Sequence, residues 1–146
     1  MQSRDQLLTA REIESTLIDY WHDVDTNWGA TAHEYYTEDG SYTTSARTRQ
    51  GRAAIAEFYA SRRDRGARIS RHLVSNVRVK IVDDRHATCN WVLVLYAADG
   101  EPVLAADVPN LISDCQDELV RADDGRWLCA SRRLLPLFKS NTPTTA

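Results

Sequence analysis

Apolar residues follow a helical period in the first part of the chain and a strand period in the second, and this order restricts the fold. An apolar stripe with helical spacing predicts a helix from about Thr9 to Asp25. Thr9 and Glu12 have the spacing of a capping box, which marks the expected start. The stripe consists of Ile13, Leu17, Tyr20, Trp21 and Val24.

Two more helices are expected before residue 66. A short one should follow Gly29, and a longer one should open at Gly51 and close in a basic segment that ends at the stop signal Gly66. This segment contains three arginines that fit either a solvated helix end or an anion-binding patch. They are Arg62, Arg63 and Arg65.

Four segments of the second half have strand composition and are separated by turn signals. They cover residues 73–82, 87–97, 103–121, with a bulge or bend at Pro109, and 127–135. Helices followed by an antiparallel sheet predict an α+β domain. We expect a curved antiparallel sheet wrapped around the N-terminal helices, which forms a conical barrel with an apolar pocket at its open mouth.

The 146 residues suffice for one domain, which we expect to span residues 1–138, with a polar, disordered tail over 139–146. Eighteen basic and 21 acidic residues do not fit a basic nucleic-acid binder. No apolar run approaches the ~20 residues of a membrane span, and no signal core opens the chain. The predicted location is therefore cytoplasmic, without nucleic-acid or membrane partners. Three lone cysteines are expected to be buried and reduced (Cys89, Cys115 and Cys129).

Some polar residues do not follow the core pattern. Arg132 shares strand parity with Leu128, Ala130 and Leu134, so it should face inward. A buried arginine needs an anionic partner, and both a structural carboxylate and a ligand fit that need. A metal site formed by His22, Asp25 and His33 is not supported by a tight ligand cluster.

His72 and Asp25 are ambiguous on spacing alone. His72 has the parity opposite to the apolar positions of its strand and should face outward, unless a bulge near Ser75 reverses the register. Asp25 follows Tyr20 by five residues, about 140° around an ideal helix, so the two share a face only if the helix ends or distorts there. An ordinary surface histidine and a solvated helix-terminal carboxylate remain open alternatives.

These residues resemble the nuclear-transport-factor-like (SnoaL-like) α+β cone superfamily, in the branch of scytalone dehydratase, hexachlorocyclohexane dehydrochlorinase and bile-acid dehydratases. The resemblance covers residues 5–138. It is carried by the Tyr-x4-Asp spacing of Tyr20 and Asp25, by Arg-His-x3-Asn-x-Arg around His72, and by Arg132 on the last strand. It implies an Asp25–His72 catalytic dyad assisted by Tyr20 and Arg132.

The resemblance also implies that the cavity is lined by Tyr42, Trp91, Asp114 and Gln116. The chain departs from scytalone dehydratase there, because the second pocket histidine of that enzyme falls near Asn90. This departure argues against scytalone as the substrate. Relatives form dimers or trimers, so a homo-oligomer is expected, with a trimer favoured.

The expected activity is that of a lyase that needs no cofactor and no metal. An Asp–His general base would remove a proton from a small hydrophobic, cyclic molecule, and water or halide would leave. Tyr20 would donate a hydrogen bond to a substrate oxygen, and Arg132 would stabilise developing negative charge. An isomerase or cyclase with the same base, and a non-catalytic ligand-binding module of the same fold, remain alternatives.

Overall fold

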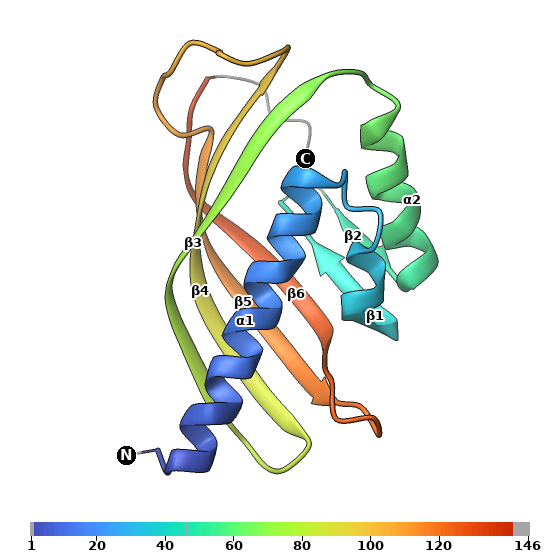
Figure 1. Cartoon of the computed structure of the whole chain (residues 1–146), viewed down its shortest axis with the longest axis vertical. Helices are drawn as coiled ribbons and strands as arrows, with labels where there is room; N and C mark the ends of the chain where they lie inside the picture. The colour runs from blue at the N-terminus through green and yellow to red at the C-terminus, as the bar shows by residue number, and fades with distance from the viewer. Residues whose placement is uncertain (1, 46, 142–146) are drawn as a thin grey trace.

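The computed structural model of the protein describes residues 2–45 and 47–141 (Figure 1). Within them, two α-helices and a short 3-10 helix pack with six strands. In chain order these elements are α1 (Arg4–Thr26), η1 (Ala32–Tyr35), β1 (Tyr36–Thr43), β2 (Thr48–Gln50), α2 (Arg52–Arg63), β3 (Arg68–Ile81), β4 (His86–Asp99), β5 (Leu111–Arg121) and β6 (Trp127–Lys139).

Helix α1 buries all five residues of the predicted stripe, but it begins earlier than the sequence suggested. The capping box is formed by Ser3 and Gln6, not by Thr9 and Glu12. Ser3 Oγ accepts a hydrogen bond from the Gln6 N–H at 3.2 Å, and Gln6 Oε1 accepts one from the Ser3 N–H at 2.9 Å. Both pairs have the required spacing, and the helix starts at the first of them because nothing between Arg4 and Thr9 breaks it.

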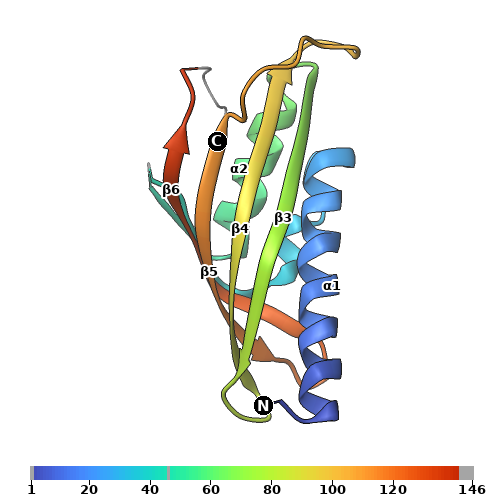
Figure 2. The ribbon, with the colours of Figure 1, turned by 90° about the vertical axis from the view of Figure 1, so that its left-hand side faces the viewer.

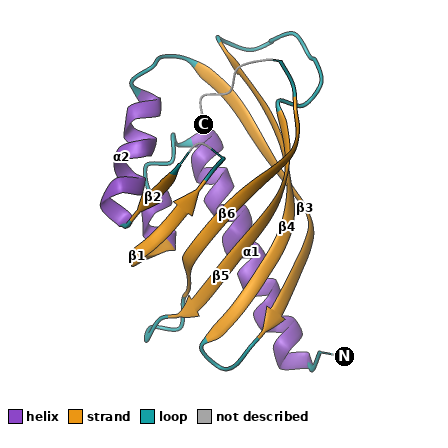
Figure 3. Ribbon diagram, turned by 180° about the vertical axis from the view of Figure 1, so that it is seen from behind, coloured by secondary structure: helices purple, strands orange, loops and turns teal. Residues whose placement is uncertain are grey.

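The sheet has the strand order β2-β1-β6-β5-β4-β3 and is strongly curved (Figure 2). Seen from behind, α1 lies behind the strands, so that it covers one face of the sheet (Figure 3). Helix α1 packs against β3, and α2 packs against β1 and β2. The α+β architecture with a curved sheet around the N-terminal helices is therefore confirmed.

Two details of the sheet differ from the expectation. Strand β1 runs parallel to β6, so the sheet is mixed instead of purely antiparallel. The sheet also stays open, with β2 and β3 as its two edges, instead of closing into a barrel. The β1–β6 pair joins segments almost a hundred residues apart, so its direction depends on tertiary packing that local patterns do not encode.

The ends of the strands also shift. The expected strand 103–121 begins only at Leu111, after Pro109, because proline cannot donate a hydrogen bond to the ladder. Strand β6 continues to Lys139, so the expected tail does not begin there, and residues 142–146 lie outside the described residues. Across the described ranges, no helix is long and apolar enough to span a membrane.

The three cysteines are buried and unpaired, as the sequence predicts. Burial raises the pKa of the Cys89 thiol to about 12, so at neutral pH it behaves as a small apolar side chain. Aromatic side chains from α1, β1, α2 and β4 form a large part of the core between the helices and the sheet. They are Tyr20, Trp21, Tyr36, Tyr42, Phe58, Tyr59 and Trp91.

Candidate active site

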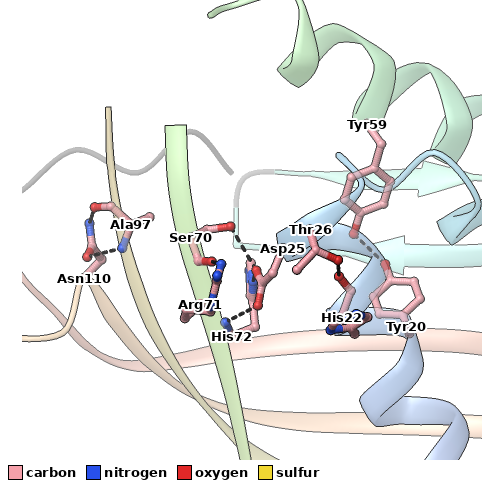
Figure 4. A network of polar contacts seen from close by, with 10 residues as sticks. All are labelled: Tyr20, His22, Asp25, Thr26, Tyr59, Ser70, Arg71, His72, Ala97 and Asn110. Atoms are coloured by element: carbon pink, nitrogen blue, oxygen red, sulfur yellow. Dashed lines mark hydrogen bonds and ion pairs between the residues drawn. The ribbon is translucent and has the colours of Figure 1, made fainter. Parts of the chain in front are cut away.

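Asp25 and His72 meet in the interior, at the C-terminal end of α1 (Figure 4). Asp25 Oδ1 lies 2.6 Å from His72 Nδ1, and Asp25 Oδ2 accepts the backbone N–H of His72 at 2.8 Å. The Ser70 hydroxyl donates to Asp25 Oδ1 at 2.9 Å. The side chains of His72 and Asp25 are only 6% and 7% exposed. Strand β3 thus fixes the carboxylate at three points, and the carboxylate fixes the imidazole.

A bulge in β3 aims His72 toward α1. Ser75 pairs with Val92 and Arg78 with Asn90, so β3 holds one more residue than β4 between these pairs. Asn76, inside the bulge, has a φ of 53°, a conformation that asparagine tolerates better than most residues. Before the bulge, the even-numbered residues Ser70 and His72 face inward. After the bulge, the odd-numbered apolar residues of β3 face inward instead. The sequence predicts an inward His72 only if a bulge near Ser75 reverses the register, and this bulge is present.

The environment keeps the imidazole neutral and sets its tautomer. Burial lowers the pKa of His72, although the bond to Asp25 opposes that shift. Burial disfavours the charged form of Asp25, but the hydrogen bonds from His72 and Ser70 hold the pKa of its carboxyl below the usual value. An ionised carboxylate can only accept, so His72 Nδ1 carries the proton and Nε2 has a free lone pair. The ring stacks on the Trp21 indole, with 4.2 Å between centroids.

Tyr20 and Arg132 form a second group. The Tyr20 hydroxyl is hydrogen-bonded to the hydroxyls of Tyr36 and Tyr59, not to the dyad. The Arg132 guanidinium lies 4.4 Å from the centre of the Tyr20 ring. Burial raises the pKa of Tyr20 well above its ordinary value, so the phenol stays protonated at neutral pH. The Trp21 ring packs against both Tyr20 and His72 and thus connects the two groups.

Arg132 is paired with a carboxylate that sequence reasoning did not identify. Its Nε and Nη2 donate to the two carboxylate oxygens of Asp117 at 2.9 and 2.8 Å. Each of these residues is only 3% exposed. The Trp91 indole N–H donates to the same carboxylate at 3.1 Å. The structural Arg–carboxylate pair is therefore present, and within this pair the Arg132 Nη1 atom is buried without a hydrogen-bond partner in the described part of the chain.

A second bulge explains the direction of Arg132. Glu118 pairs with Ser131 and Leu119 with Cys129, so Ala130 is an extra residue in β6. Arg132 therefore faces inward, as predicted, but in the company of Trp127 and Cys129 instead of Leu128 and Ala130. The sequence did hold a signal for its partner, because Asp117 shares strand parity with the inward-facing Cys115 and Leu119.

The other predicted cavity residues divide into two pairs. Tyr42 and Trp91 are buried in the interior, where Tyr42 stacks on Tyr59 with 6.4 Å between centroids. Asp114 and Gln116 are exposed on the opposite face of β5, so the expectation that they line the interior is wrong. Side chains alternate along a strand, and the buried Cys115 between them fixes which parity is turned inward.

The cavity beside the dyad is small. It has a volume of about 150 Å³, and its lining includes Asp25, Ser70, Tyr59 and Trp28 but not His72. Aromatic packing thus replaces most of the expected apolar pocket. Among the residues that the structure describes, no group of three or more histidine, cysteine or acidic side chains is placed to hold a metal ion.

Residues 5–133 match the family model of the SnoaL-like domain. No curated protein sequence is significantly similar to the chain.

Many solved structures share the fold. A candidate scytalone dehydratase from Novosphingobium aromaticivorans has a TM-score of 0.81 at 21% identity, over 94% of this chain and 90% of that one. ActVI-ORFA from Streptomyces coelicolor has a TM-score of 0.75 at 21% identity, over 86% and 95%. An NTF2-like protein with a cystatin-like fold, also from N. aromaticivorans, has a TM-score of 0.74 at 23% identity, over 94% and 88%. At these identities the likeness concerns the fold alone.

Proposed function

Because the chain belongs to the SnoaL-like domain family, we propose that it is a cofactor-independent lyase in which His72, oriented by Asp25, removes a proton from a small hydrophobic, cyclic substrate. The observation that carries this proposal is the buried 2.6 Å contact between Asp25 Oδ1 and His72 Nδ1. Burial distinguishes it from the surface contact of His86 with Asp83, in which both side chains are 57% exposed. The contact is the one that a general base needs to hold its tautomer and stabilise its protonated form.

The proposed reaction begins with transfer of a carbon-bound proton to His72 Nε2. The electron pair of the broken C–H bond forms a double bond to the adjacent carbon, and the leaving group departs from that carbon with the electron pair of its own bond. A halide leaves as the anion, whereas a hydroxyl takes up one proton from solvent and leaves as water. Asp25 then stabilises the imidazolium. General base catalysis of this kind contributes about 10²–10⁴-fold to a rate.

Tyrosine hydroxyls can assist the leaving group in this scheme. Tyr59 lines the cavity beside Asp25, and burial raises the pKa of its phenol well above the ordinary value. It therefore keeps its proton and can donate a hydrogen bond to a departing oxygen. Tyr20 is hydrogen-bonded to Tyr59 and would polarise it from behind. Arg132, whose charge Asp117 already balances, would position Tyr20 instead of neutralising a substrate charge.

The first experiment screens hydroxylated and halogenated cyclic compounds in deuterated water, with product detection by NMR. A lyase forms an alkene and loses water or halide. An isomerase or cyclase returns a deuteron to carbon without losing a group, and a binding module does neither. We expect alkene formation by the native protein and its loss in the Asp25→Asn variant, because an amide cannot stabilise the imidazolium as a carboxylate does. Deuterium incorporation without elimination would contradict the lyase assignment.

A further inference from the structure

The cavity beside Asp25 also contains an arginine that forms no ion pair with an acidic residue in the described part of the chain. Arg62, in the last turn of α2, lines this cavity and is only 9% exposed. Its Nε is buried without a hydrogen-bond partner. The guanidinium lies 5.5 Å from the Phe58 ring centre and 5.7 Å from that of Tyr59. Aromatic faces hold it in place, but they do not satisfy its N–H groups.

A second arginine on the cavity wall repeats this pattern. Arg68, at the start of β3, lines the same cavity, and its Nη2 is likewise buried without a partner. The carboxylate among the lining residues, Asp25, is already engaged by His72 and Ser70. A buried guanidinium nitrogen without an acceptor is costly, whereas the Arg132 guanidinium elsewhere in the core is paired with Asp117.

A third arginine, outside the cavity wall, adds positive charge near Arg62. Arg49 of β2 lies 3.8 Å from the centre of the same Phe58 ring that Arg62 approaches. Its Nε is also buried without a partner, and its one hydrogen bond to a side chain goes to the neutral Thr44 hydroxyl at 3.2 Å. The region around α2 therefore favours a negatively charged occupant.

We infer that the cavity binds an organic carboxylate, held by Arg62 and Arg68, and that the substrate of the dyad carries this group on its ring. That the bound carboxylate belongs to a substrate rests on the proposed function. The presence of a carboxylate site does not rest on it. A guanidinium presents parallel N–H donors that match the two carboxylate oxygens, so such a group would satisfy the unpartnered nitrogens. Because Asp25 lines the same cavity, a ring anchored there would lie beside Asp25, the partner of His72.

The test uses benzoate and cyclohexanecarboxylate as probes and benzamide as the neutral counterpart, with binding measured by calorimetry on the whole chain. Arg62→Gln should weaken benzoate binding by at least about tenfold, the scale of a hydrogen bond to a charged group. Arg63→Gln is the matched control, because Arg63 is exposed one residue further along α2 and the variant removes the same charge. If Arg62→Gln does not fold, benzoate binding is measured with the Arg68→Gln and Arg62→Lys variants instead.

Equal affinity for benzoate and benzamide, no benzoate binding by the native protein, or equal effects of the variants at Arg62 and Arg63 would overturn the inference. The His72→Gln variant keeps the two proposals apart, because it should still bind benzoate. Benzoate binding that depends on Arg62, together with no reaction in the deuterium assay, would support the carboxylate site and contradict the lyase.

Discussion

Replacement of His72 by glutamine is expected to slow turnover by about 10²–10⁴-fold, the usual contribution of a general base. Glutamine keeps a polar side chain next to Asp25 but has no lone pair that takes up a proton at neutral pH. The loss should appear in kcat, because the substrate is held by the cavity wall and not by the base. The measurement is steady-state kinetics on the substrate identified in the deuterium screen.

His22 provides the control for this variant. It lies on the same turn of α1 as Asp25 but is exposed, and its side chain has no part in the proposed chemistry. His22→Gln should therefore leave kcat within about twofold of the native value, since surface substitutions have small effects. Full turnover by His72→Gln would show that another group is the base.

Replacement of Asp117 by asparagine is expected to lower the free energy of unfolding by about 3–5 kcal/mol. The variant leaves Arg132 charged and buried against aromatic rings without a counter-ion, and this is the source of the cost. The loss is large against the ~5–15 kcal/mol that stabilises a typical domain. Urea unfolding followed by tryptophan fluorescence measures it.

The exposed pair of Arg85 and Asp123 is the matched control. Its atoms are 2.7 Å apart, as close as in the buried pair, but solvent screens the two charges. Asp123→Asn should therefore cost less than about 1 kcal/mol. A double replacement, Asp117→Leu with Arg132→Met, should recover much of the loss, because it removes both charges together. A loss below about 1 kcal/mol for Asp117→Asn would mean that Arg132 finds another counter-charge.

Periodicity predicted the helix and the strands that position the site. The apolar stripe of α1 identified the residues that are buried, and the strand-like segments correspond to β3 to β6. The short helix expected after Gly29 corresponds to η1. Strand β2 was missed, because it has only three residues and carries no period that a sequence pattern can show. Capping motifs were ambiguous, because the same spacing occurs twice at the start of α1.

Bulges and long-range pairs limit what the sequence reveals about the site. The inward directions of His72 and Arg132 both depend on an extra residue in a strand, and only Asn76 hints at such a position. A one-residue shift moves a side chain to the other face, which is why Asp114 and Gln116 were placed inside while Asp117 was overlooked. Partners such as Ser70, Asp117 and Trp21 depend on tertiary packing.

The most direct test of the account is an NMR titration of His72, with its imidazole signals assigned by their absence in His72→Gln. At pH 7 the ring nitrogens should show a protonated Nδ1 and an unprotonated Nε2. Burial lowers the pKa of His72, so the midpoint should lie below the ordinary value of about 6.5. The unfolded chain takes up this proton first as the pH falls, so the free energy of unfolding should decrease below about pH 6.5. The value of kcat/KM should fall only as the pH passes the lower midpoint of His72 in the folded protein. A ring protonated on Nε2 at pH 7, or a midpoint above 6.5, would contradict a neutral base held by Asp25.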